Sequence, residues 1–219
     1  SLIPLDISAT VSDVLITKSN IGSQIKSLNE LPKGYSIGTS SLRRKAQLLN
    51  LRNDLQIVNL RGNVTTRLEK LRFHDELDGI VLAMAGIERL QLLEKYQSNI
   101  FIIPETEIFP AIGQGRLAAQ VLNENNETVN LLKSIQDLNA VTVLSAERKL
   151  VEKLGADCNS AVGIKCKLDN DKFAMSARVL SSDGNICIEE NLFGEKVNAD
   201  KIADQLAETL LSRGAAQYL

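Results

Sequence analysis

Apolar positions along residues 35–104 follow two alternating spacings. Short apolar runs indicate strands, whereas apolar residues three and four positions apart, as in VTTRLEKLRF, indicate amphipathic helices. The pattern predicts strands at 35–40, 55–60, 79–85 and 99–104 and helices at 41–51, 64–73 and 86–96. Because repeated strand–turn–helix units connect by right-handed crossovers, this stretch is expected to form a doubly wound α/β layer with parallel strands.

The spacing changes towards the C-terminus. A short apolar strand at 116–122 precedes two helical stretches at 127–137 and 138–155. Beyond them, three alternating segments separated by DND and SDGN turns predict an antiparallel meander, and an amphipathic helix ends before Gly214. The C-terminal third is therefore expected to be a separate small α+β domain with a three-stranded antiparallel sheet.

Composition narrows the function classes. The 219 residues are 44% hydrophobic and 24% charged, with a net charge of -2, which argues against a nucleic-acid partner. Membrane-length apolar runs and a signal-peptide pattern are absent from the sequence. Three cysteines without a CxxC pair and a single histidine argue against a disulfide framework or a metal site. A cytoplasmic protein is the expectation.

Arginines gather where the predicted strands pass into their helices. They are Arg43, Arg44, Arg61, Arg67 and Arg89. In an open parallel sheet, the carboxyl ends of the strands and the helix N-termini share the edge where ligands bind. Cations early in a helix oppose its dipole, so a ligand with several negative charges explains them better than helix stability does. Solvated surface arginines are the alternative.

The cysteines indicate less about function than the arginines do. Cys158 lies in a polar turn, and its neighbour Asp157 opposes formation of a thiolate, so its surroundings favour an unreactive loop cysteine. Cys166 and Cys187 fall in alternating segments and are expected to be core or sheet residues. His74 lies near a helix end, where we expect it to cap the helix or to be solvated.

Several stretches together resemble the porphobilinogen deaminase family, also called hydroxymethylbilane synthases. They are GTSSLRRKAQL (38–48), LRGNVTTRLEKL (60–71), AMAGIERL (83–90), PAIGQG (110–115), SAERKLVEKLGADCNSAVG (145–163) and the closing helix. Their order and spacing match the family over most of residues 35–219. The resemblance implies a doubly wound, periplasmic-binding-protein-like central domain and a small α+β C-terminal domain.

The family joins four porphobilinogen units into hydroxymethylbilane in tetrapyrrole (haem) biosynthesis, releasing ammonia at each addition. Its primer is a dipyrromethane held by a cysteine thioether, and the matching position is Cys158, which reverses the expectation from its neighbours. By family match, the cofactor-binding residues are Cys158, Ser41, Arg43, Arg44, Arg61 and Gly62, and the substrate-binding residues are Arg67, Arg89 and Gln114. The implied partners are porphobilinogen and the growing polypyrrole chain, with neither nucleic acid nor membrane, and the full-length protein is expected to be a monomer.

The sequence also departs from the family pattern. The H-S-M-K-D motif with the catalytic aspartate is missing, so no residue is assigned as catalytic. Ser12 stands where an arginine is usual, Asp13 matches a different family aspartate, and Arg116 stands where a small residue is common. The expected division is residues 1–16 and 116–135 as a remnant of a first domain, 17–115 as the second domain and 136–219 as the third.

These departures leave several functions open. We expect this chain alone to be unable to complete catalysis. Residues 116–135 are expected to return to the first domain and to pair with strands that this sequence lacks. The main rival function is a non-catalytic carboxylate-binding module of the periplasmic-binding-protein type, and a further one is a structural or regulatory remnant without ligand.

Overall fold

The computed structural model describes residues 2–5, 9–157 and 159–219. The strands are β1 (Leu2–Pro4), β2 (Asp13–Thr17), β3 (Ser36–Gly38), β4 (Gln56–Val58), β5 (Gly79–Ala83), β6 (Ile100–Ile102), β7 (Ala118–Gln120), β8 (Val162–Asp169), β9 (Lys172–Leu180) and β10 (Cys187–Glu195). The α-helices are α1 (Leu42–Leu51), α2 (Val64–Phe73), α3 (Met84–Arg89), α4 (Leu93–Tyr96), α5 (Asn126–Ser134), α6 (Leu138–Leu154) and α7 (Ala199–Ser212). Short 3-10 helices lie at Asn20–Ser23, Leu28–Glu30, Lys196–Asn198 and Ala215–Tyr218.

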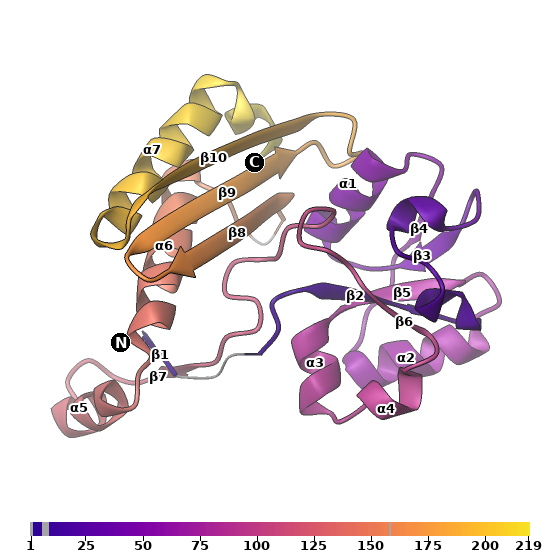
Figure 1. The fold of residues 1–219 in the computed structure, drawn as a ribbon, viewed down its shortest axis with the longest axis horizontal. Coiled ribbons are helices and arrows are strands. Elements are labelled where there is room, and N and C mark those ends of the chain that lie inside the picture. The colour runs from indigo at the N-terminus through magenta and orange to yellow at the C-terminus, as the bar shows by residue number, and fades with distance from the viewer. Residues whose placement is uncertain (1, 6–8, 158) are drawn as a thin grey trace.

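A five-stranded sheet in the order β4-β3-β5-β2-β6 forms the central α/β unit (Figure 1). β3 runs parallel to β4 and β5, whereas β2 runs antiparallel to both β5 and β6. The expected α/β class is confirmed, but the expectation of parallel strands alone was wrong. The reason is β2, which enters from the N-terminal segment and inserts between two strands that lie much later in the chain.

Alternation along β2 and β5 gives the sheet a core on each face. Leu15 and Val81 face one core, which includes Ile37 and Leu48, while their neighbours in the strands face the other. That second core includes Val14, Ile16, Leu68, Leu71, Ile80, Leu82 and Ile87. α1 contributes to the first core and α2 and α3 to the second, so both faces of the sheet are covered.

α1 and α2 start at the caps that the sequence predicts, whereas α5 ends at Ser134, three residues before the expected end. Ser41 caps α1 by accepting the Arg44 N–H, and Asn63 caps α2. The single helix expected at 86–96 is instead α3 and α4, because the chain breaks at Gln91, whose φ of 55° lies in the left-handed region. The helix also begins earlier, at Met84, directly after β5.

The predicted antiparallel meander is confirmed as a three-stranded sheet in the order β10-β9-β8. α6 and α7 pack together against one face of it, and their shared core includes Leu150, Met175 and Leu206 (Figure 1). α7 ends before Gly214, whose φ of 90° suits the left-handed turn that closes the helix.

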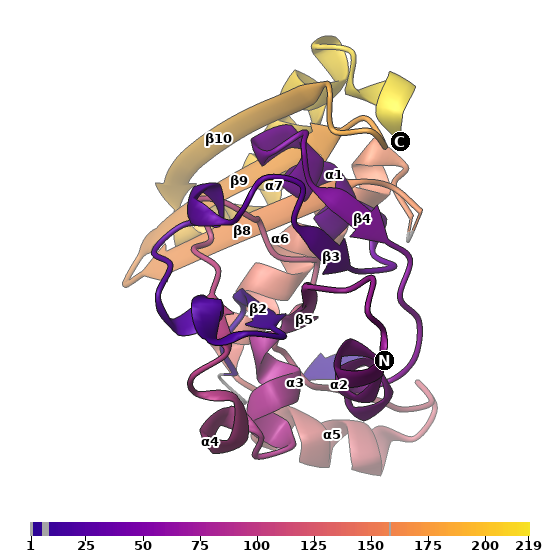
Figure 2. The same ribbon diagram turned by 90° about the vertical axis from the view of Figure 1, so that its right-hand side faces the viewer.

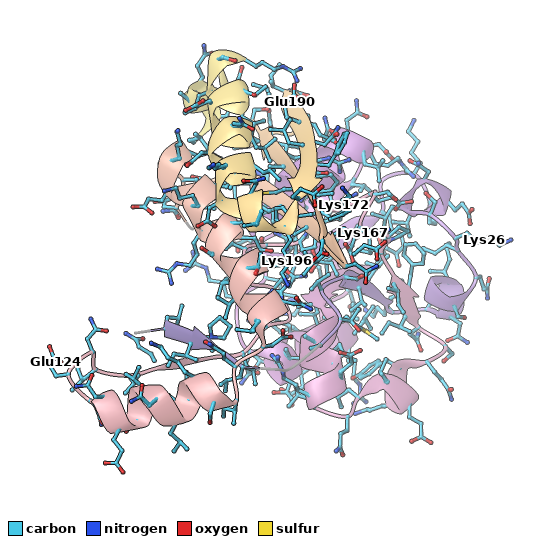
Figure 3. The ribbon with its side chains drawn as sticks, turned by 60° about the vertical axis from the view of Figure 1, so that its left-hand side comes forward. Lys26, Glu124, Lys167, Lys172, Glu190 and Lys196 are labelled. Atoms are coloured by element: carbon cyan, nitrogen blue, oxygen red, sulfur yellow. The ribbon has the colours of Figure 1, made fainter. Side chains whose placement is uncertain are left out.

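β1, β7 and α5 form an arm that projects from the body, with Glu124 near its outer end (Figure 3). We expected residues 116–135 to pair with strands that this sequence lacks, but β7 pairs antiparallel with β1 of the same chain. Apolar side chains remain exposed on the arm and near it, at Leu2, Leu117, Leu122, Leu131, Ile135 and Leu138.

The expected boundary between the first and second parts, after residue 16, falls inside strand β2. Residues 13–16, expected with the N-terminal segment, lie in β2 with residues of the five-stranded sheet. The central α/β unit contacts the C-terminal sheet through α1. The Asn50 side chain at the end of α1 donates to the Gly184 carbonyl of the β9–β10 turn, and α1 packs near β9 (Figure 2). No helix in the described ranges is long and apolar enough to cross a membrane.

Candidate functional site

The site is built around a buried carboxylate, Asp13, at the start of β2. Arg43 Nη2 lies 2.9 Å from Asp13 Oδ2, and Arg44 Nη2 lies 2.7 Å from Asp13 Oδ1. All three residues are nearly inaccessible, at 1%, 6% and 8% exposed. Since Arg43 and Arg44 occupy the first turn of α1, the carboxyl end of β3 brings them against the neighbouring part of the sheet. Both arginines are therefore buried, which rules out the solvated alternative for these two.

The charges of this cluster do not cancel. Burial opposes ionisation of Asp13, but the guanidiniums of Arg43 and Arg44 outweigh it and hold the pKa of the carboxyl below its usual value. Two guanidiniums against one carboxylate leave an excess positive charge. Arg44 Nε is also buried without a hydrogen-bond partner among the described residues. An unpartnered donor beside excess positive charge favours an anionic ligand.

Gln114 completes the cluster from the turn at residues 110–116. Its Oε1 accepts from Arg43 Nη2 at 3.1 Å, and its Nε2 donates to Asp13 Oδ1 at 2.9 Å. Gly113 and Gly115 on either side have φ values of 65° and 80°, which side chains rarely adopt. The two glycines thus allow the tight turn that presents the Gln114 amide to the cluster.

The second group of predicted residues surrounds the N-terminus of α2. Arg67 Nε donates to the Gly62 carbonyl at 2.7 Å. Partial burial lowers the pKa of Arg67, and the positive charge of Arg44 lowers it further. Arg61 is exposed and lines a polar cavity of about 240 Å³ with Ser41, Lys45 and other residues of α1, β4 and the turns beside them. These cations share the edge of the sheet that the ligand-site rule predicts.

Arg89 corrects one expectation. It was placed early in the third helix, but it is the last residue of α3, because that helix begins at Met84. Its guanidinium donates to the Gly115 carbonyl at 3.0 Å and so contacts the turn that carries Gln114. The geometry connects Arg89 to the cluster through the backbone of this turn.

Cys158 lies outside the described residues. Its neighbours do not: Asp157 and Ser160 line a cavity of about 410 Å³ together with Ser41 and Arg43. Ser160 Oγ accepts from the Asp157 N–H at 3.1 Å, and Asp157 Oδ1 accepts from the Asn159 N–H at 2.7 Å. The loop is thus held by its own polar side chains beside the positive cluster.

The remaining predictions are simple to place. Cys166 lies in β8 and Cys187 in β10, both half-buried, so the expectation of sheet residues is confirmed. His74 follows α2 as its C-cap and is exposed, also as expected. No cluster of His, Cys, Asp or Glu in the described ranges could hold a metal ion.

Two carboxylates were missed as parts of the site. Asp13 stands at the start of the apolar run DVLIT. A charged residue in a buried strand indicates that it is paired with an opposite charge, but the sequence does not show which residue supplies that charge. Glu147 is only 6% exposed on α6, and nothing in its helical surroundings distinguishes it from solvated charges. Lys45 was missed as well, although it follows Arg43 and Arg44 in the same helix.

A molecule with several carboxylates fits this arrangement. The cavity beside Asp157 is lined by the Ser41 and Arg43 side chains and by apolar residues of the linking turn and α6, such as Ile112 and Val151. Ring-shaped apolar groups can lie on the apolar wall while their acidic side chains reach guanidiniums. The donor set therefore suits a group built from aromatic rings with acidic substituents.

Comparison with known proteins gives a consistent picture. A family model described as "Porphobilinogen deaminase, dipyromethane cofactor binding domain" matches residues 6–130. The chain is 39% identical over 207 residues to a porphobilinogen deaminase of Alkaliphilus metalliredigens, covering 94% of this chain and 63% of the relative. It is 40% identical over 202 residues to that of Francisella tularensis subsp. novicida, covering 91% and 64%. The chain thus spans a little under two thirds of the length of these relatives.

Proposed function

The chain belongs to the porphobilinogen deaminase family, and on that premise we propose that it forms the cofactor-binding part of a hydroxymethylbilane synthase. The resemblance inferred from the sequence motifs is confirmed by this membership. The observation that carries the proposal is the excess positive charge of Arg43, Arg44 and Asp13 beside a cavity that the neighbours of Cys158 also line. The pathway is tetrapyrrole (haem) biosynthesis.

In this proposal, Cys158 holds dipyrromethane through a thioether, and the chain's arginines bind the acidic side chains of the pyrroles. When bound, dipyrromethane supplies the terminal pyrrole carbon to which porphobilinogen units are added. Arg43 and Ser41 bind carboxylates at the cavity wall, and the buried guanidinium of Arg44 adds positive charge behind them. Asp13 fixes the guanidiniums in place, and Gln114 fixes Asp13.

The outer residues would hold later parts of the polypyrrole chain. Arg61 and Gly62 are proposed for the cofactor, and Arg67 for the substrate, since they lie at the same edge of the sheet. Arg89 acts from the other side of the Gln114 turn. Porphobilinogen and the growing chain are the proposed partners, in the cytoplasm. The full-length protein as a monomer stays a prediction that light scattering can check.

Covalent attachment tests the proposed function. When the purified chain is incubated with hydroxymethylbilane, the Cys158 thiol is expected to displace the hydroxyl group of its hydroxymethyl carbon with release of one water, so the intact mass should rise by one tetrapyrrole less one water, with complete loss of the adduct in Cys158→Ser. Cys187→Ser is the matched control and should keep the adduct, because Cys187 is a half-buried sheet residue of β10. An adduct that survives Cys158→Ser, or a wild-type chain that neither forms an adduct nor binds porphobilinogen, would contradict the proposal.

We further propose that residues 1–219 alone do not complete the reaction, because they contain no H-S-M-K-D motif to supply the catalytic aspartate. Consumption of porphobilinogen by this chain is expected to stay at the uncatalysed rate in an assay of hydroxymethylbilane formation. A full-length family member provides the positive control. Sustained turnover by residues 1–219 would overturn this expectation.

A carboxylate-binding module remains the second candidate, because the arginine edge is present while the catalytic motif is not. This candidate rests on a likeness to periplasmic-type solute-binding modules. It predicts saturable binding of porphobilinogen that Cys158→Ser leaves unchanged and no covalent adduct. Calorimetry of the wild type and Cys158→Ser chains, together with their intact masses, distinguishes the two functions. A structural remnant would bind nothing.

A further inference from the structure

Glu147 is a buried carboxylate on α6 that the proposed function does not use. It is 6% exposed, comparable to Asp13. Asp13 has two guanidinium partners, whereas no lysine or arginine nitrogen in the described ranges lies within 4 Å of the Glu147 carboxylate. A buried carboxylate without an ion pair needs other partners to hold it.

The partners of Glu147 come from the turn at residues 110–116 and from the C-terminal sheet. Glu147 Oε2 accepts the backbone N–H of Gly113 at 2.8 Å, and the Cys166 thiol of β8 lowers the pKa of the carboxyl. Arg116 of the same turn contributes a favourable positive charge from farther away. Glu147 therefore joins α6 to the turn at residues 110–116.

The turn at residues 110–116 connects Glu147 to the arginine cluster. Gly113 precedes Gln114, whose amide contacts Asp13 and Arg43. On the other side, Arg89 donates to the Gly115 carbonyl. Gln114 is consequently held between an anchor on α6 and an anchor on α3, each one residue away from it.

We propose that Glu147 is a positioning residue, which fixes the Gly113–Gln114 turn and thereby sets the Gln114 amide against Asp13 and Arg43. It does not line the cavity, so we place its effect on the arginine cluster in the turn that carries Gln114. The ligand measurements below rest on the proposed function. The spectroscopic and unfolding measurements do not need a ligand.

The protonation of Glu147 provides a signature of this contact. Burial raises the pKa of Glu147, while the Gly113 N–H, Arg116 and the Cys166 thiol lower it by smaller amounts. The folded pKa exceeds the ordinary value of 4.5. Stability from this group is therefore complete below that value and is lost as pH rises through the folded pKa.

Nuclear magnetic resonance tests the contact directly. We expect the Gly113 amide proton to shift with pH in a single titration above 4.5 in the wild type, and this titration to vanish in Glu147→Gln. The urea midpoint of the wild type should fall relative to that of Glu147→Gln as pH rises through the same range. Glu152→Gln, an exposed change on the same helix, is the matched control and should leave the titration intact.

Binding then tests the route through Gln114. Glu147→Ala should weaken porphobilinogen binding about ten-fold, a loss of about 1.4 kcal/mol in binding free energy, and Glu147→Gln should restore it to within about three-fold because its amide oxygen still accepts the N–H. In a Gln114→Ala background, Glu147→Ala should change the affinity less than about two-fold. Equal losses in both backgrounds would overturn the proposal.

Failure of the proposed function gives a different pattern. If the wild type neither forms the adduct nor binds porphobilinogen, the proposed function fails. Whenever porphobilinogen does not bind, the positioning role is decided by the coupling of Glu147→Ala and Gln114→Ala in urea unfolding. Non-additive midpoint shifts support the role, and additive shifts contradict it. A Gly113 amide that does not titrate in the wild type, or that still titrates in Glu147→Gln, contradicts it as well.

Discussion

Asp13→Asn is expected to lower the free energy of unfolding by about 3–5 kcal/mol, because it leaves two buried guanidiniums without their carboxylate. Urea unfolding at neutral pH, followed by circular dichroism, measures the loss. Asp75→Asn is the control: Asp75 is fully exposed and its pair with Lys18 is solvated, so no measurable change is expected.

The same variant has a predicted pH dependence. Although burial opposes it, the pairing with Arg43 and Arg44 holds the pKa of Asp13 below its ordinary value of 3.8. The stability that Asp13 contributes is present above 3.8 and is lost as pH falls through the lower folded pKa. The difference in the free energy of unfolding between wild type and Asp13→Asn should therefore decrease at acidic pH. A difference that stays constant from neutral to strongly acidic pH would show that the carboxylate charge is not its source.

Phe109→Ala is expected to cost about 3–5 kcal/mol, since Phe109 is 1% exposed and its removal leaves a cavity. The ring lies 3.9 Å from the Arg178 guanidinium of β9 and 4.8 Å from the Lys165 ammonium of β8, measured to the ring centre. Its backbone N–H donates to Gln47 of α1, and its carbonyl accepts from the same side chain.

Phe109 thus connects the C-terminal sheet to the helix that carries the arginines. Removal of its ring should weaken the contact between the C-terminal sheet and α1 as well as the total stability. Phe193→Ala is the matched control, because Phe193 is 84% exposed and its loss should not be measurable. Calorimetric unfolding of both variants checks the prediction, and equal melting temperatures for Phe109→Ala and wild type would contradict it.

Local pattern was enough to predict most elements of the fold. The helix at 64–73 has the predicted bounds, because an asparagine cap and a regular apolar stripe define it within the segment itself. β2 was not predicted from DVLIT, and its antiparallel direction depends on partners at 79–83 and 100–102. No local spacing encodes such long-range pairing, so the mixed character of the sheet could not be predicted.

The site divides in the same way. Arg43 and Arg44 were predicted to lie at a ligand-binding edge, because strand-to-helix turns can be located from sequence and ligands bind at the carboxyl ends of parallel strands. That both are buried against Asp13 follows only from the insertion of β2 beside them. The role of Cys158 came from family resemblance alone, since its neighbour Asp157 argued against a reactive thiol.

The central position of β2 also has a consequence for synthesis of the protein. Val14 pairs with Leu82 on one side and with Ile102 on the other, so the strand leaves the ribosome long before either partner. Such distant pairing is slow to form, because long loops must close first. Until residue 102 has emerged, the backbone N–H and C=O groups on at least one edge of this apolar strand have no partner strand. During this interval the nascent chain is exposed to aggregation, and chaperones protect such chains.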